Sequence, residues 1–180
     1  MKTFIEIIKA AEENDWCVNP FCTTCGSREF KDELRKLSEE HESGFIDALC
    51  AADLSDLQSS SNWRDVLRIT LGQIDDVKDM DKVFKAWLPN LQSNIPLADF
   101  VMFYFCRGGL LFSTMSGEVL GAWIDACKEL AIKTKNESLI ESLIYTLPEG
   151  IKYDQELMEV IKRAAVDSGK IRRAIATATG

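Results

Sequence analysis

Apolar side chains recur every three or four residues along nearly the whole chain, which is the spacing of one face of an α-helix. The clearest run consists of Trp63, Val66, Leu67, Thr70, Leu71 and Ile74. No segment alternates between apolar and polar residues over a useful length, and hairpin dipeptides between β-branched runs are absent, so strands have little support. The pattern predicts an all-α fold, either an irregular helical bundle or a short stack of about eight helices.

The same spacing, with proline and polar breaks between segments, locates the individual helices. We expect helices at 3–14, from Ser27 to about His41, at 45–57, 63–74, 83–91, 97–106, 119–134, 137–146 and 154–166, and from Lys170 onward. The segment 97–106 is apolar on nearly all sides, which is typical of a helix covered by neighbours. It is therefore predicted to lie in the middle of the core.

Length and composition favour one soluble globular domain spanning residues 1–180. Apolar residues make up 46% of the chain and charged residues 28%, which disfavours disordered, collagen-like and disulfide-dense proteins. The formal net charge is −8, whereas broad capture of nucleic acid needs clustered Lys and Arg. The charge therefore argues against a nucleic-acid partner.

The N-terminal segment lacks the long apolar run and the cleavage site of a signal peptide. The most apolar stretch, 97–112, is shorter than the roughly 20 residues of a membrane span, and it carries Asp99 and Arg107. We expect a cytoplasmic protein with no membrane segment. Its six cysteines should then be reduced thiols rather than disulfides.

Three of these thiols, Cys17, Cys22 and Cys25, cluster in a predicted loop at 15–27. Two thiolates separated by two residues can bind one zinc ion, because the turn between them points both sulfurs inward. Cys17 could supply a third ligand. The fourth could be His41, the only histidine of the chain, or alternatively Cys50, Asp15 or a water. The candidate zinc ligands are thus Cys17, Cys22, Cys25 and His41.

Three other interpretations of this cluster stay open. The spacing Cys-x4-Cys-x2-Cys resembles that of plant-type ferredoxins, which implies an iron–sulfur cluster, although that family has a strand-rich fold. Cys22 and Cys25 could instead form a redox dithiol near a helix N-terminus, where the helix dipole lowers a thiol pKa. Finally, reduced cysteines could simply pack with Trp16 and Phe21 against the helices, and Cys50, Cys106 and Cys127 have apolar surroundings of the same kind.

No catalytic constellation is evident. His41 stands in an acidic segment without a surrounding pocket, and no glycine-rich phosphate loop is present, so an enzyme is unsupported. Acidic residues at Asp75, Asp76, Asp79 and Asp81 match a solvated helix start rather than a calcium loop.

The C-terminal end is locally basic. Such residues can form a docking face for an acidic partner, or can favour helix C-termini without any partner. They are Lys162, Arg163, Lys170, Arg172 and Arg173.

The last third contains a faint internal repeat. Residues 123–128, followed by 136–140, resemble 160–165, followed by 169–175, at a separation of about 34 to 37 residues. This spacing resembles HEAT or armadillo-type helical repeats, and the tetratricopeptide signature is absent. The resemblance implies a curved helical stack that binds another macromolecule through exposed helix faces.

We therefore expect a cytosolic helical protein-interaction module, an adaptor or an inhibitor, with a structural cysteine loop. An acidic inhibitor would occupy a basic site on its partner. The alternative is a zinc-binding or thiol-redox protein that uses the N-terminal cysteines.

Overall fold

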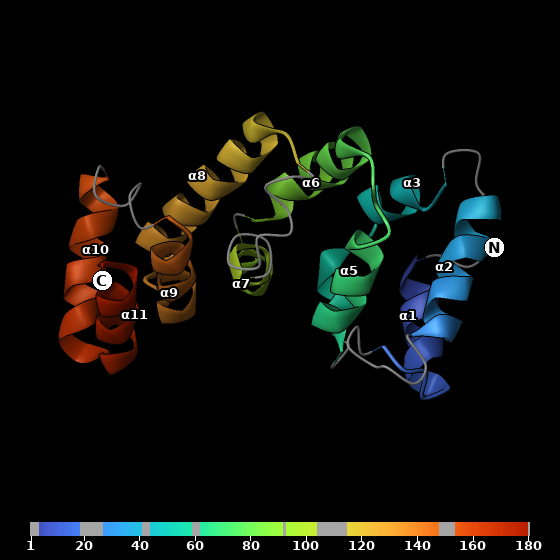
Figure 1. The fold of residues 1–180 in the computed structure, drawn as a ribbon, viewed down its shortest axis with the longest axis horizontal. Coiled ribbons are helices and arrows are strands. Elements are labelled where there is room, and N and C mark those ends of the chain that lie inside the picture. The colour runs from blue at the N-terminus through green and yellow to red at the C-terminus, as the bar shows by residue number, and fades with distance from the viewer. Residues whose placement is uncertain are drawn as a thin grey trace. The chain divides into compact units, whose positions relative to one another are not determined.

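The computed structural model describes residues 4–18, 27–40, 44–58, 62–91, 93–103, 115–147 and 154–179. All regular structure in these ranges is helical, which confirms the predicted all-α class (Figure 1). The helices are α1 (Phe4–Glu13), α2 (Arg28–Glu40), α3 (Gly44–Cys50), α4 (Leu54–Leu57), α5 (Trp63–Leu71), α6 (Val77–Leu91), α7 (Ile95–Val101), α8 (Gly117–Thr134), α9 (Glu137–Thr146), α10 (Gln155–Asp167) and α11 (Gly169–Thr179).

Most helices begin where a polar side chain can satisfy a backbone donor of the first turn. The side-chain oxygens of Asn94, Asn136 and Asp154 each accept a hydrogen bond from the backbone amide three residues later. The donor–acceptor distances are 3.1, 3.1 and 3.0 Å. The start of α6 is less obvious from the sequence. There Asp76 Oδ1 accepts from the Lys78 amide at 2.6 Å, so α6 begins six residues before the apolar pattern indicates.

The expected helix at 45–57 is divided into α3 and α4. The division falls at Asp53, whose Oδ1 accepts from the Ser55 amide at 2.8 Å and thereby starts a new helix. The expected central helix at 97–106 is observed as α7, and the end of the expected segment lies outside the described residues.

Contacts divide the chain into two compact units, residues 1–87 and 88–180, with the boundary inside α6. In the first unit, α1 packs against α2, α3 and α4, and α2 also contacts α3 and α5. The buried core of this unit includes Phe4, Ile7, Phe30, Leu34, Leu49, Leu67 and Phe84. The Trp87 indole joins α6 to this core, because its Nε1 donates to the Leu49 carbonyl at 2.8 Å.

The second unit contains two helix pairs. Helix α8 packs against α9, and α10 packs against α11. The pairs also contact each other in register, first helix to first helix (α8 with α10) and second to second (α9 with α11), while α7 contacts α9. The buried side chains between these helices include Leu97, Phe100, Trp123, Leu139, Leu143, Leu157, Ile161 and Ile171. Cys127 is fully buried among them, as its apolar surroundings indicate.

None of the helices in the described ranges is long and apolar enough to cross a membrane. The prediction of one domain over residues 1–180 stays a prediction.

Candidate functional site

Of the four candidate zinc ligands, the structure describes Cys17 alone. Cys22, Cys25 and His41 lie outside the described residues. Cys17 follows the end of α1, where Asp15 adopts a left-handed φ of 51° and the Trp16 amide donates to the Ala11 carbonyl at 2.9 Å. This turn leaves the Cys17 thiol half-buried and free of any disulfide. Within the described ranges, no three Cys, His, Asp or Glu side chains converge on a common point where a metal could bind.

The neighbours of Cys17 line a shallow pocket. Trp16 and Val18 line it together with Glu12 of α1 and Asn62 before α5. Its volume is about 10 Å³, which corresponds to a single water molecule. A pocket of this size cannot enclose an organic substrate.

Cys50, the alternative fourth ligand, ends α3 and is half-buried. Burial raises the pKa of its thiol, and the nearby ammonium of Lys82 opposes that change only in part. Lys82 itself forms an ion pair with Asp47 across α6 and α3. A raised pKa lowers the thiolate fraction at neutral pH, so Cys50 lacks the property that makes a cysteine reactive.

In the acidic cluster at the start of α6, Asp75, Asp76 and Asp79 are exposed and Asp81 is half-buried. Asp76 stabilises the first turn through the bond to Lys78 described above. The geometry agrees with the expected helix start and gives no indication of a cation site.

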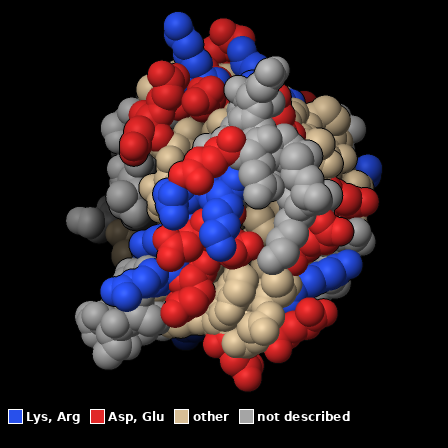
Figure 2. Space-filling view, turned by 90° about the vertical axis from the view of Figure 1, so that its right-hand side faces the viewer, with Lys and Arg blue, Asp and Glu red and all other residues tan. Residues whose placement is uncertain are grey.

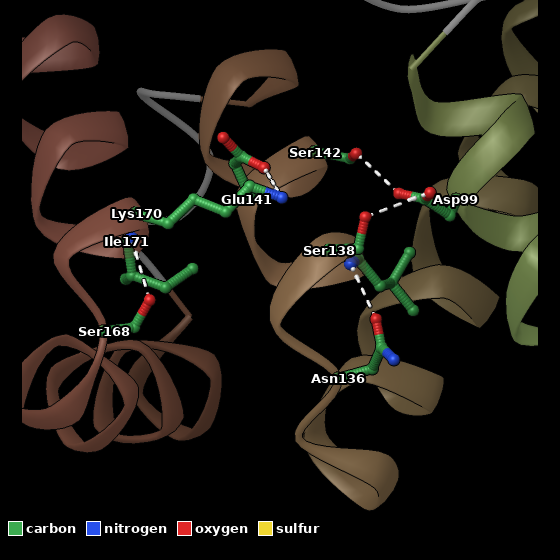
Figure 3. Close-up of polar contacts among 9 residues, drawn as sticks. Asp99, Asn136, Ser138, Glu141, Ser142, Ser168, Lys170 and Ile171 are labelled. Carbon is green, nitrogen blue, oxygen red and sulfur yellow. Dashed lines mark hydrogen bonds and ion pairs between the residues drawn. The ribbon is translucent and has the colours of Figure 1, made fainter.

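A line of polar contacts crosses three helices of the second unit (Figure 3). Asp99 of α7 accepts hydrogen bonds from the hydroxyls of Ser138 at 3.1 Å and Ser142 at 2.9 Å, both on α9. On the same turn of α9, Glu141 pairs with Lys170 of α11 at 2.5 Å. One turn of α9 therefore makes polar contacts with both α7 and α11. The sequence signal for this arrangement is Asp99 itself, an acid in a segment that is otherwise almost entirely apolar.

The basic C-terminal residues lie at the junction of α10 and α11, which we define as the α10–α11 corner (residues 162–173). Arg172 Nη1 donates to the carbonyls of Ala165 at 2.7 Å and Val166 at 2.9 Å, so it satisfies the C-terminal end of α10. Ser168 accepts from the Ile171 amide at 3.3 Å and caps α11. The sequence identified Arg172 as basic but did not reveal this capping role, because the donor follows the helix end by several residues.

The first unit shows no concentration of one charge like that of the α10–α11 corner on the face that carries α1 and α2. Figure 2 shows the face that carries α1 and α2, where acidic and basic side chains are interspersed. Several pair along α2, for example Arg35 with Glu39 at 2.5 Å and Lys36 with Glu33 at 2.6 Å. Exposed pairs of this kind contribute little to stability and produce no field of one sign.

Comparison with known proteins found no matching family model, no matching curated protein and no matching solved structure.

Proposed function

We propose that this chain is a cytoplasmic protein-interaction module that binds a protein partner through the helix stack of its second unit. The observation that carries the proposal is the in-register packing of the two helix pairs, α8 on α10 and α9 on α11. Stacked pairs of this kind bury their apolar faces against each other and leave a broad surface of helix faces for a partner.

The internal repeat of the sequence supports this interpretation. Its two copies, 123–140 and 160–175, lie within the pairs α8–α9 and α10–α11 and cover part of each. The contacts of α7 with α9, reinforced by Asp99, add a further helix to the row of second helices. A HEAT-like or armadillo-like organisation of this unit is therefore part of the proposal.

The polar contacts described above hold this row in a defined register. Asp99 fixes α7 to α9, and Lys170 fixes α11 to the same turn of α9. Binding surfaces built on rigid helices lose less conformational entropy on association than surfaces built on loops. The stack therefore loses little conformational entropy when a partner binds, and the cysteine loop of the first unit has a structural role within this proposal.

The proposal is tested by site-specific photo-crosslinking in an extract of the cells that make the protein. A photoreactive residue is introduced at Asp125 and at Arg173 in the second unit, and at Lys31 and Arg35 of α2 as matched exposed controls. We expect one partner protein, identified by mass spectrometry, to be crosslinked from the second unit and to bind again when both proteins are purified. Crosslinking from α2 alone would contradict the assignment to the helix stack. A purified chain that converts a small molecule without any partner would contradict the proposed function.

A further inference from the structure

The α10–α11 corner concentrates positive charge in an acidic chain. Five of the 21 Lys and Arg residues lie in the twelve residues 162–173, which contain only one of the 29 acidic residues, Asp167. Two of the five have structural partners in unit 2, since Lys170 pairs with Glu141 and Arg172 caps α10. Lys162 pairs with Glu159 at 3.3 Å on the exposed surface, where such a pair is weak. Arg163 and Arg173 are exposed beside them.

The same corner holds the most exposed large apolar side chain of the described residues. Val166 is 76% exposed, compared with 39% for Val77 and 44% for Phe103. Helix α10 buries Leu157 and Ile161 against its neighbours, and Val166 lies on the opposite face of the helix, five residues after Ile161. Valine is also a weaker helix former than Lys, Gln or Glu. Neither burial nor helix propensity therefore accounts for a valine at this position.

The backbone around Val166 is held firmly. Its carbonyl accepts from Arg172, and the next helix is capped by Ser168, which is only 6% exposed. Ile171, three residues after Ser168, is fully buried. Lys170 joins the start of α11 to α9 through its ion pair with Glu141 (Figure 3). The exposed Arg163 precedes Val166 by three residues on α10, so the two side chains are neighbours on the helix surface. An exposed apolar side chain next to basic groups is thus presented on a firmly held turn, which is the arrangement of an anchor residue beside a polar rim.

We propose that the α10–α11 corner is a docking surface, and that its partner is an acidic protein segment that covers Val166 with an apolar side chain. This proposal rests on the proposed function and specifies where the partner binds. Charge complementarity selects the partner, because a basic corner in a chain of net charge −8 attracts carboxylates. The apolar centre favours a protein over a nucleic acid, since a phosphate backbone offers nothing to cover a valine and the acidic remainder of the chain repels it.

The test uses a fluorescein-labelled helical peptide of Glu and Leu as the probe, and measures its Kd for the full chain by fluorescence anisotropy. Two variants remove the proposed contacts: Val166→Gln, which leaves a good helix former in place, and the double variant Arg163→Glu/Arg173→Glu. The matched controls are Val77→Gln and the double variant Arg28→Glu/Lys31→Glu, which change one exposed valine and reverse two exposed positive charges elsewhere. A same-length peptide with Lys in place of Glu and a single-stranded DNA oligonucleotide complete the set.

We expect the acidic peptide to bind, and its Kd to rise about tenfold in Val166→Gln, as expected when the burial of one valine is lost. The double variant should weaken binding by at least as much at low salt, and the difference should shrink as salt is added. The two control variants should bind like the original chain. No measurable binding of the acidic peptide, or binding unaffected by both test variants, would overturn the proposal.

Two outcomes would assign the corner to another occupant and so overturn the proposal. One is tighter binding of the DNA oligonucleotide, unaffected by Val166→Gln. The other is self-association of the chain that is lost in the double variant, as measured by analytical ultracentrifugation. The proposed function is judged separately with the crosslinked partner. If that partner binds both test variants as tightly as the original chain, the docking surface is wrong while the interaction module stands.

Discussion

Trp87 shows how one side chain can join a helix to a core by both apolar and polar means. Trp87 is 1% exposed, and the centroid of its ring lies 5.9 Å from the centroid of the Phe84 ring. Its Nε1 donates to the Leu49 carbonyl. Trp87→Phe removes the donor and leaves a void beside the ring. We expect the free energy of unfolding to fall by about 2–4 kcal/mol, measured by urea denaturation. The same substitution at the half-buried Trp16 is the control and should cost less. Equal losses at the two positions would show that the buried hydrogen bond contributes nothing.

Cys50 gives a prediction that depends on pH. Burial raises the pKa of its thiol, and the thiolate is the form that reacts with iodoacetamide. Its alkylation, followed by peptide mass spectrometry, should therefore require a higher pH in the folded chain than in urea. Because Lys82 lowers this pKa, Lys82→Gln should slow the reaction further. Because the folded state binds the thiol proton more tightly, the contribution of Cys50 to stability is fully present below its unfolded pKa and is lost as the pH rises through its raised folded pKa. Faster alkylation of the folded chain would contradict the assignment.

The zinc prediction is tested directly by the metal content of the purified, tag-free chain. If Cys17, Cys22 and Cys25 bind zinc, about one ion per chain should be present and should be lost when all three are changed to Ser. A metal-free chain whose stability is unchanged by the triple substitution would assign these thiols to packing.

At the level of single residues, the sequence predicts burial well and polar partners poorly. The periodic positions Trp63, Val66 and Leu67 are buried as expected. By contrast, the Arg172 bonds to α10 depend on how two helices meet, and no local spacing encodes that geometry. The candidate cysteine site is of the same kind: the sequence spacing allows Cys22 and Cys25 to share one ion, but a fourth ligand such as His41 would depend on the tertiary fold.

At the level of elements, helices were predictable because apolar periodicity extends over several turns. The division between α3 and α4 was not, because it depends on one Asp53 side chain that bonds to a nearby amide in place of the helical pattern. The early start of α6 has the same cause at Asp76. Short polar side chains next to helix ends therefore decide boundaries that the apolar pattern leaves open.

Asp99 tests how far a polar contact between elements stabilises the second unit. Asp99→Ala removes the acceptor of two α9 hydroxyls, one of which belongs to Ser142 and is 6% exposed. We expect a loss of about 1–3 kcal/mol in the free energy of unfolding. Asp99→Asn, which keeps one acceptor oxygen, should lose less. Asp125→Ala is the matched control on α8, because its side chain is 73% exposed and its pair with Lys128 is weak. A loss as large at Asp125 would show that general surface charge, not the α7–α9 contact, is responsible.

For the whole molecule, the decisive element is α6, because it crosses the boundary between the two compact units. It carries the buried Val83, Phe84 and Trp87 before the boundary and the buried Leu91 after it. A helix gains its hydrogen bonds cooperatively, so loss of structure at one end of α6 withdraws support from the other. We therefore expect both units to unfold in a single transition, as the prediction of one domain requires.

Hydrogen exchange followed by mass spectrometry in increasing urea measures this coupling. Peptides from α5 should report the first unit and peptides from α9 the second, and their unfolding midpoints should coincide. Trp87→Phe provides the stronger test, because its hydrogen bond to Leu49 and its ring contact with Phe84 lie in the first unit. If α6 couples the units, that substitution lowers the midpoint of α9 as much as that of α5. If α9 keeps its midpoint, the two units are separate domains, and the helix stack of the second unit can be studied for partner binding independently of the cysteine-bearing first unit.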